Sequence, residues 1–454
     1  MQLIKEIQAD YLTAISAFLR IKGKNKCLLE SIPRDKSKGR YSIIAWDAAA
    51  EITYAGSQLT IGGKVFKTRD PLKEIERFVL KKEEADIVLP FQGGAIGYVG
   101  YDVITCYEEL GEIPFDELNI PDIHFYLFDS YLIFDHVGEK ISLVEADTYS
   151  NRTIEELEKA LNQRSNELQI PNEAERKDIQ LAPLNYESNF TKEDFEQVVS
   201  KIKEYIRQGD LFQMVPSQRL KAVFSGDPFD YYRRLRVTNP STYLYFLDFG
   251  ETYVVGSSPE SLVSVKAGIV TTNPIAGTRK RGGTVEQDTL LENELLNDEK
   301  ERAEHLMLID LGRNDIGRVS ETGSVEVPIY MTVEKYRFVM HLVSVVTGKL
   351  KSGFSSMDAL KATLPAGTVS GAPKIRAMQR IYELEPVKRN IYAGAVGYLS
   401  KDDQADFAIA IRTMIIHKGT AYVQAGAGIV HDSDPTKEYE ETLQKAKALL
   451  EVSQ

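Results

Sequence analysis

Short runs of apolar residues, separated by glycine, asparagine and charged residues, follow one another through the first 145 residues. After an opening helix, this pattern predicts strands at 26–30, 41–45, 51–54, 58–61, 123–135 and 140–145. Brief apolar runs with turn residues between them are typical of antiparallel sheet. The first part of the chain is therefore predicted to be rich in sheet, with few helices.

The pattern changes between residues 149 and 187, where polar residues dominate. A surface helix at 152–168 is predicted there, followed by a stretch in which prolines and asparagines interrupt any period. We place a connecting segment at 149–187, between a unit at 1–148 and a second unit at 188–454. The second unit opens with Thr191, a hydroxyl cap for a helix at 192–207, and a strand at 211–219 follows.

Two glycine-rich segments echo each other about 300 residues apart. GAIGY spans residues 94–98 and GAVGY spans residues 394–398, and each precedes a strand-rich passage. The echo suggests a duplicated sheet architecture, and the alternative is a coincidence between two similar strands.

Composition narrows the class of protein. The 454 residues carry a formal net charge of −12, which argues against a nucleic-acid-binding surface. Only two cysteines are present, Cys27 and Cys106, too far apart for a CxxC site, so a reducing compartment such as the cytoplasm is expected. No export signal or membrane-spanning segment is predicted.

Two glutamate pairs are the first candidates for chemistry. Glu301 and Glu304 share a face of one predicted helix, and Glu438 and Glu441 share a face of another that begins at Pro435. On ordinary helices such pairs are solvated. The glycine-rich segment 424–430 precedes the second helix and would let a ligand approach the backbone, so the pairs are candidates for Mg²⁺.

Anion-binding and proton-transfer candidates lie elsewhere. Thr278 precedes a basic run, 279–281, which suits a carboxylate ligand or is simply a solvated turn. Arg412 is predicted within a doubly apolar strand at 407–416, where it needs an ion pair or a ligand. Glu260, between two strands, could donate a proton from a dry pocket or be a turn residue. His341 lies in apolar sequence, where a satisfied core histidine is the ordinary outcome.

These segments, taken in chain order, resemble the chorismate-utilising enzymes, and among them the anthranilate synthase component I family. The resemblance spans nearly the whole chain. Its motifs are GDLFQMVPS at 209–217, SPE at 258–260, PIAGT at 274–278, ERAEH at 301–305, DLGRND at 310–315, MHL at 340–342, GAG at 426–428 and ET at 441–442.

The resemblance implies an α+β fold, a mixed sandwich of antiparallel sheets with outer helices around a central cleft. It implies amination of chorismate with loss of pyruvate, giving anthranilate for tryptophan biosynthesis. Glu304 and Glu441 would hold Mg²⁺, with Glu301 and Glu438 orienting its waters. The implied catalytic residues are Glu260, His341, Thr278 and Gln213, and the implied substrate-binding residues are Ala276, Gly277, Thr278, Tyr392, Arg412, Gly426, Gly428 and Lys445.

Two positions distinguish the members of this family by the reaction that they catalyse. Isochorismate-forming and salicylate-forming relatives have a lysine where this chain has Gln213, and aminodeoxychorismate synthases commonly have one where it has Ala276. Both residues favour ammonia as nucleophile and anthranilate as product. The alternative within the family is aminodeoxychorismate synthase component I, and the alternative outside it is a non-catalytic amino-acid sensor.

Partners also follow from the resemblance alone. A feedback pocket for tryptophan is implied at Leu29, Glu30, Ser31, Asn239, Pro240 and Tyr243, so the unit at 1–148 would carry part of it. No glycine-flanked nucleophilic cysteine is seen, so a separate glutamine amidotransferase subunit would supply ammonia, in a heterotetramer.

Overall fold

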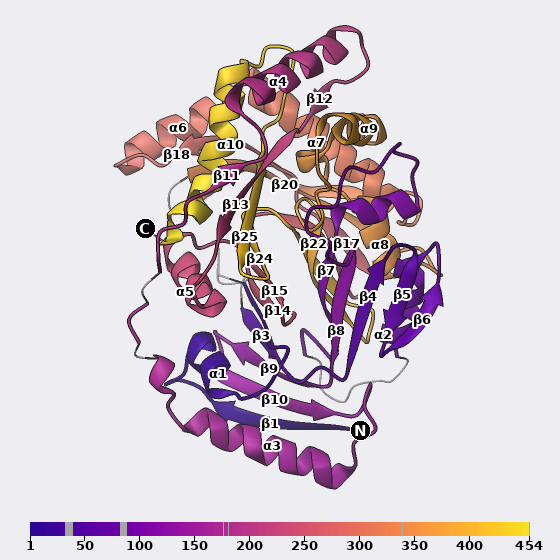
Figure 1. The fold of residues 1–454 in the computed structure, drawn as a ribbon, viewed down its shortest axis with the longest axis vertical. Coiled ribbons are helices and arrows are strands. Elements are labelled where there is room, and N and C mark those ends of the chain that lie inside the picture. The colour runs from indigo at the N-terminus through magenta and orange to yellow at the C-terminus, as the bar shows by residue number, and fades with distance from the viewer. Residues whose placement is uncertain (32–39, 82–88, 176, 180, 337–338, 454) are drawn as a thin grey trace.

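Two large sheets dominate the computed structural model, which describes residues 1–31, 40–81, 89–175, 177–179, 181–336 and 339–453 (Figure 1). The first sheet has 11 strands. In spatial order these are β1 (Gln2–Gln8), β10 (Lys140–Ala146), β9 (Ser130–Asp135), β3 (Tyr41–Ala45), β2 (Cys27–Ser31), β14 (Tyr243–Asp248), β15 (Thr252–Ser258), β24 (Thr413–His417), β25 (Thr420–Gly426), β13 (Ser217–Val223) and β11 (Glu187–Ser188).

The second sheet has 12 strands. Its order is β18 (Ile275–Lys280), β20 (Val339–Lys349), β17 (Ile269–Thr272), β16 (Ser261–Lys266), β23 (Ala405–Ile409), β22 (Ala395–Ser400), β7 (Gly94–Val99), β8 (Ile123–Phe128), β4 (Ala50–Ala55), β5 (Gln58–Ile61) and β6 (Lys64–Lys67), with β19 (Glu326–Lys335) also paired to β20. A small ladder joins β12 (Gln213–Met214) to β21 (Gly371–Ala372). All the strand ladders of the described residues are antiparallel.

The helices cover the outer faces of both sheets. They are α1 (Ala14–Arg20), α2 (Pro71–Val79), α3 (Ile154–Gln169), α4 (Lys192–Arg207), α5 (Pro228–Thr238), α6 (Val285–Asn297), α7 (Glu299–Gly317), α8 (Ser356–Thr363), α9 (Lys374–Leu384) and α10 (Pro435–Leu450). Short 3₁₀ turns are η1 (Tyr101–Cys106), η2 (Glu173–Glu175), η3 (Gly367–Val369) and η4 (Glu451–Ser453). Figure 1 shows α3 beneath β1 and α10 at the opposite end. Among the described residues, none of the helices is both long and apolar enough to cross a membrane.

Three apolar layers make this arrangement a sandwich. Side chains alternate along β14, so that Tyr245 and Leu247 enter a core between the two sheets while Leu244 and Phe246 enter a core under α1, α3, α5 and α10. A third core lies between the 12-stranded sheet and α2, α4, α7, α8 and α9. The predicted α+β sandwich of antiparallel sheets with outer helices is confirmed.

The duplicated architecture suggested by the glycine echo is confirmed. The two echo segments are β7 and β22, which pair with each other in the middle of the sheet with Gly97 opposite Gly397. Strands β1 to β10 then correspond, in chain order and sheet position, to β13, β14, β15, β16, β17, β20, β22, β23, β24 and β25. In the second half, β18, β19, α6 and α7 are inserted between β17 and β20.

Several predicted elements differ from the structure. The opening segment is a strand, β1, because its residues pair with β10 along its whole length, and the helix α1 begins only at Ala14. The predicted strand 123–135 is two strands, β8 and β9, which enter different sheets at Asp129. The predicted strand 211–219 divides likewise, into β12 and β13. A uniform apolar pattern does not reveal such a crossing, because both faces of each sheet are buried.

The predicted helices 152–168 and 192–207 correspond to α3 and α4. Thr191 caps α4 by accepting a hydrogen bond from the amide of Asp194 at 3.1 Å. Both large sheets contain strands from either side of residues 149–187. The division into units at 1–148 and 188–454 stays a prediction.

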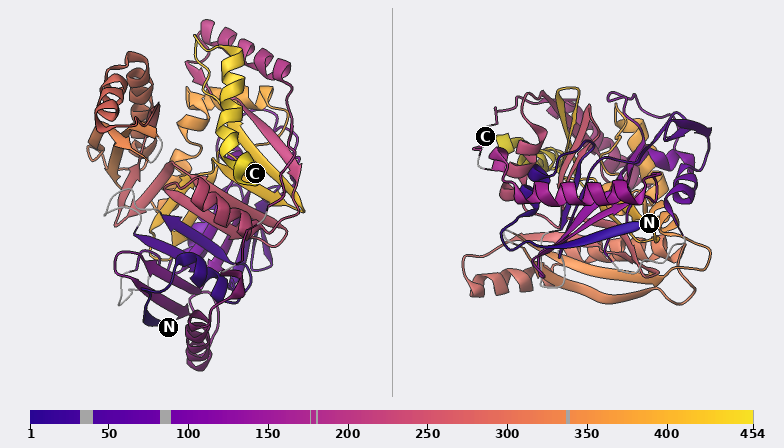
Figure 2. Two further views of the ribbon diagram at one scale, coloured as in Figure 1. Left: turned by 90° about the vertical axis from the view of Figure 1, so that its left-hand side faces the viewer. Right: turned by 90° about the horizontal axis from the view of Figure 1, so that it is seen from below.

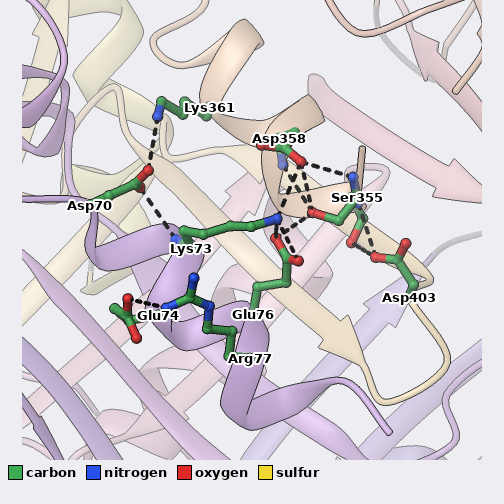
Figure 3. A network of polar contacts seen from close by, with 10 residues as sticks. Asp70, Lys73, Glu74, Glu76, Arg77, Ser355, Asp358, Lys361 and Asp403 are labelled. Atoms are coloured by element: carbon green, nitrogen blue, oxygen red, sulfur yellow. Dashed lines mark hydrogen bonds and ion pairs between the residues drawn. The ribbon is translucent and has the colours of Figure 1, made fainter. Parts of the chain in front are cut away.

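A polar network joins the two halves at corresponding helices, α2 and α8 (Figure 3). Lys73 pairs with Glu76 at 2.8 Å and faces Asp358 at 3.8 Å. The Ser355 hydroxyl, which caps α8, donates to Glu76 at 2.5 Å, and Lys361 pairs with Asp70 at 3.3 Å. These contacts tie the N-terminal half to the half that holds the candidate site.

Candidate active site

A cavity of about 350 Å³ lies in the second half, next to the inserted strand β18. Its walls include the predicted residues Glu260, Ala276, Thr278, His341, Tyr392, Arg412, Gly426 and Lys445. The structure therefore brings together eight residues from positions spread over almost 190 residues of chain. Figure 2 (left) shows the inserted segment, in salmon to orange, as a separate lobe across a gap from the yellow helix α10.

Glu260 lies where the chain crosses from one sheet to the other, between β15 and β16. Its backbone carbonyl accepts a hydrogen bond from Ile409 at 3.0 Å, which fixes the crossing. Its carboxyl oxygen Oε2 accepts from the hydroxyl of Thr368 at 3.0 Å. Glu260 is thus a held carboxyl group at a cavity wall, in accord with a proton-transfer role and not with an exposed turn.

Arg412 was predicted within a strand, and this is wrong. It lies between β23 and β24, at a second crossing between the sheets, with a left-handed φ of 51°. Its guanidinium donates to the carbonyl of Lys445 at 2.6 Å. Burial lowers the pKa of Arg412, although nearby Glu260, Tyr392 and Glu441 oppose this. The cavity therefore presents a cation whose charge is only partly compensated, as a carboxylate ligand requires.

Thr278 and His341 are directly opposite each other on β18 and β20. The register shifts at Gly277, whose φ of 65° is a conformation that favours glycine. His341 Nδ1 lies 2.8 Å from the Gly277 carbonyl and 3.1 Å from the Thr278 hydroxyl. Because a carbonyl only accepts, Nδ1 carries the proton, and Nε2 of the neutral ring is the basic nitrogen.

The basic run after Thr278 is neither a ligand cluster nor a solvated turn. Arg279 pairs with Glu294 at 2.9 Å, Asp298 at 2.8 Å and Glu301 at 3.3 Å. Arg281 binds Asp288, which holds the pKa of that carboxyl down at about 2. These arginines attach β18 to α6 and α7 instead of facing a ligand.

The first carboxylate pair lies near Gln213, which is buried on β12. Its Nε2 donates to Glu304 Oε1 at 3.3 Å. Burial raises the pKa of Glu304, and the neighbouring charge of Glu301 adds to this. Glu304 is a half-buried carboxylate whose pKa stays raised although Lys300 and Lys445 lower it, and a bound cation would relieve this condition.

In the second pair, Glu438 resembles Glu304. Burial raises the pKa of Glu438, with a further contribution from Glu441, and Lys300 and Lys445 lower the pKa of both Glu304 and Glu438. Both carboxylates therefore lie within the field of the same two lysines. In the described part of the chain, no three carboxylate, histidine or cysteine side chains are gathered closely enough to hold a metal as they stand.

The wall opposite β18 is formed by β25 and α10. Lys445 donates to the Gly426 carbonyl at 3.1 Å and pairs with Glu441 at 2.8 Å. A side chain at Gly428 would begin 2.9 Å from the Gln213 amide, so glycine there lets the chain pass close to that residue. Burial raises the pKa of Tyr392 to about 12, so its hydroxyl stays protonated and can donate to a ligand.

The segments predicted to bind tryptophan lie side by side. Ser31 on β2 is directly opposite Tyr243 on β14. Glu30 is already occupied, because it binds Arg236 at 2.7 Å and the Tyr232 hydroxyl at 2.6 Å. Leu29 lies opposite Tyr245, Asn239 donates to the Ala448 carbonyl of α10 at 2.8 Å, and Pro240 lines the cavity next to the second sheet crossing.

Sequence reasoning missed other cavity residues. Thr368 and Val369 belong to the segment PAGTVSGAPK at 365–374, which resembles a phosphate loop but does not match the GxxxxGK[ST] pattern, since Ala372 and Pro373 follow Gly371. Gln424 comes from the glycine-rich segment before α10, and Val215 from the segment after Gln213. The only signal for Thr368 was a small-residue loop of unassigned purpose.

Comparisons with known proteins identify the family of the chain. The family model described as chorismate binding enzyme matches residues 25–451. The chain is 53% identical to anthranilate synthase component 1 of Lactococcus lactis over 456 residues, covering 100% of both chains. It is similar to the crystal structure of anthranilate synthase component I from Streptococcus pneumoniae, with a TM-score of 0.87, 54% identity and 98% of each chain covered. The menaquinone-specific isochorismate synthase of Escherichia coli, at 21% identity and a TM-score of 0.73 over 100% and 95% of the chains, shares the fold.

Proposed function

Since the chain belongs to the chorismate binding enzymes, and within them to the anthranilate synthase component 1 relatives, we propose that it converts chorismate and ammonia to anthranilate, pyruvate and water. The observation that carries this proposal is the convergence of Glu260, Thr278, His341, Arg412 and Lys445 on one cavity. The substrate is a dianion, and the cavity offers it Arg412 and Lys445 within an otherwise acidic protein.

Substrate binding falls to residues on two walls. Arg412 and Tyr392 would grip the carboxylate of the enolpyruvyl group, together with backbone amides near Gly428. Thr278, with Ala276 and Gly277 beside it, would lie against the reacting ring. A ligand held from both walls is fixed before reaction, which removes much of the entropic part of the barrier.

The donor set fits Mg²⁺, because carboxylate oxygens are its preferred protein ligands and the raised pKa values of Glu304 and Glu438 indicate unmet negative charge. Glu304 and Glu441 would hold the ion, with Glu301 and Glu438 orienting its waters. Bound there, it would neutralise and orient the ring carboxylate of the substrate.

Two of the chain's own residues would move protons. Glu260 donates a proton to the C4 hydroxyl as it leaves, while ammonia adds at C2, so that water departs instead of hydroxide. In the second stage the C2 proton is lost and the enolpyruvyl group leaves as pyruvate. His341 serves this elimination, since its Nε2 is the basic nitrogen of the neutral ring.

Gln213 favours ammonia over water as the nucleophile. A lysine at that position could act as a base for water, whereas an amide has no basic nitrogen. In this chain the amide donates to Glu304, so its role is to orient a metal-binding carboxylate.

A product assay tests the proposal. The full chain, given chorismate, ammonium and Mg²⁺, is expected to form anthranilate, seen by its fluorescence, and pyruvate in equal amounts. Omitting ammonium should stop both products. An aminated product without pyruvate would indicate aminodeoxychorismate synthase instead, and no turnover would support a non-catalytic sensor.

We also propose feedback inhibition by tryptophan at the junction of β2 and β14, supported by the position of Ser31 opposite Tyr243. Ser31→Ala is expected to raise the half-inhibitory tryptophan concentration about two- to tenfold, the cost of one hydrogen bond. Rates are normalised to each variant without tryptophan, and the exposed Ser57→Ala serves as control. Equal inhibition of both variants would place the tryptophan site elsewhere.

The relatives' designation as component 1 supports a partner subunit. We propose that this partner is a glutamine amidotransferase that delivers ammonia to the cavity in a cytoplasmic heterotetramer. Glutamine should then replace ammonium only when the partner is present.

A further inference from the structure

A buried ion pair lies directly behind the cavity. Arg389 precedes β22 and is 1% exposed, and Glu385 follows α9 and is 5% exposed. The guanidinium donates to both carboxyl oxygens, through Nε at 2.9 Å and Nη2 at 2.5 Å. Although burial opposes it, the charge of Glu385 raises the pKa of Arg389 above its ordinary value, so the guanidinium is charged.

Arg389 also holds two segments of the cavity wall. Its Nη1 donates to the Val369 carbonyl at 2.6 Å and its Nη2 to the Val215 carbonyl at 2.7 Å. Val215 and Val369 both line the cavity. One guanidinium therefore fixes the distance between the segment that follows Gln213 and the turn η3.

Glu385 adds a third segment. Its Oε1 accepts from the amide and hydroxyl of Ser217 at 2.8 and 2.9 Å. The Ser217 oxygen in turn accepts from Gln424 Nε2 at 2.8 Å. Gln424 lines the cavity from β25, so the ion pair joins three separate parts of its wall.

The turn η3 links Arg389 to the proposed proton donor, Glu260. It consists of Gly367, Thr368 and Val369, and the Thr368 hydroxyl donates to Glu260 at 3.0 Å. Arg389 is thus linked to the proposed acid through the residue next to Thr368. The turn is also packed tightly, since a side chain at Gly367 would begin 1.9 Å from Leu311 of α7.

The duplicated fold allows the position of Arg389 to be compared with the first half. The corresponding lead into β7 in the first half, residues 89–93, contains no charged residue. A buried ion pair is a weak contributor to stability, because apolar residues of similar size often serve as well. Within the described residues that lead into β7, Leu89 stands at the position of Arg389, so the guanidinium has no counterpart there and a role in the half with the cavity is indicated.

We propose that the Arg389–Glu385 pair is a positioning element of the active site, acting through η3 and Thr368 on the carboxyl group of Glu260. This rests on the proposed function, in which Glu260 is the acid. The Thr368 hydroxyl fixes the rotation of that carboxyl group, and Arg389 fixes the turn that presents the hydroxyl. A displacement of about 1 Å in such a group is enough to cost on the order of 10²-fold in rate.

Thr368→Val and Arg389→Lys test this directly. Valine keeps the shape of threonine without a donor, and lysine keeps the charge but cannot form the fork to two carbonyls and a carboxylate. Both variants are expected to lower kcat by about tenfold or more. KM should change less than about threefold, because the residues proposed to bind the substrate, Arg412 and Tyr392, are retained. Thr368→Ser, which restores the donor, should recover most of kcat.

Thr105→Val is the matched control. Thr105 also lies in a 3₁₀ turn and donates its hydroxyl to a nearby carbonyl, that of Asp102, at 2.7 Å. Wild-type kcat in Thr368→Val, or an equal loss in Thr105→Val, would overturn the proposal. So would Arg389→Lys if it lowered the melting temperature but left kcat unchanged. If Arg389→Lys does not fold, the kcat values of Thr368→Val and Thr368→Ser test the proposal.

A second readout separates this inference from the proposed function. Amide hydrogen exchange over residues 365–372 should accelerate in Arg389→Lys and stay unchanged in Thr368→Val. No turnover by the wild-type chain would refute the proposed function. Amide hydrogen exchange would then be the measurement that tests whether Arg389 holds the turn. Unchanged exchange in Arg389→Lys refutes the positioning role even where turnover is normal.

Discussion

Glu260→Gln is expected to lower kcat for anthranilate formation by about 10²- to 10⁴-fold, the range for a lost general acid. Glutamine has nearly the same shape, and its carbonyl oxygen can still accept the Thr368 hydrogen bond seen at 3.0 Å. The fold and the cavity wall should therefore survive. What disappears is the proton that allows the C4 hydroxyl to leave as water.

The kinetic signature distinguishes an acid from a binding residue. KM should change little, because the groups proposed to grip the substrate remain, and an interaction that matters only in the transition state appears in kcat. Glu251→Gln is the control, since its side chain is 76% exposed and belongs to a turn before β15. A Glu260→Gln enzyme with normal kcat would show that proton donation comes from elsewhere.

Local sequence signals located the helices α3, α4, α7 and α10. Thr191 precedes α4, and Pro435 opens α10 after the cap Asp434, so both boundaries could be read from capping chemistry. The glutamate spacing also placed Glu301 with Glu304 on α7, and Glu438 with Glu441 on α10. These predictions depend only on neighbours along the chain.

Crossings between the sheets could not be predicted in the same way. Asp129 divides β8 from β9, and Arg412 lies between β23 and β24. In each case the flanking strands are apolar on both faces, because each sheet is covered on both sides. A continuous apolar run looks the same whether the chain stays in one sheet or passes to the other.

The duplication explains why the crossings between the sheets are important for the site. Asp129 and Arg412 occupy corresponding crossings in the two halves, but only the second half carries the insertion with β18 and α7. The cavity is built where a crossing meets that insertion. Thr368 is also brought to the site by tertiary structure alone, since it lies 108 residues from Glu260 in the chain. No spacing rule reports such contacts.

The second large effect expected is on the response to Mg²⁺. Glu304→Gln and Glu441→Gln should each lower turnover at fixed Mg²⁺ by about 10²- to 10³-fold, since a bound metal contributes several kcal/mol of charge stabilisation and each 1.36 kcal/mol is tenfold. The Mg²⁺ concentration for half-maximal rate should rise in both variants. Chelation should abolish wild-type turnover, and added Mg²⁺ should restore it.

Glu440→Gln provides the control on the same helix as Glu441, because Glu440 is exposed and belongs to neither pair. Equal Mg²⁺ dependence in Glu304→Gln, Glu441→Gln and Glu440→Gln would remove the two carboxylates from the proposed metal site. A shift confined to one of them would leave that residue as a ligand and exclude its partner.

Stability should move in the opposite direction to activity for Glu304→Gln. Burial and the charge of Glu301 raise the pKa of Glu304, so above that pKa the ionised group is less favourable in the folded state than in the unfolded state. Replacing it with a neutral amide removes this cost. Without metal, near neutral pH, the variant should therefore melt at the same temperature as the wild type or higher. A melting temperature that falls together with turnover would show a structural carboxylate, not one held in place for a cation.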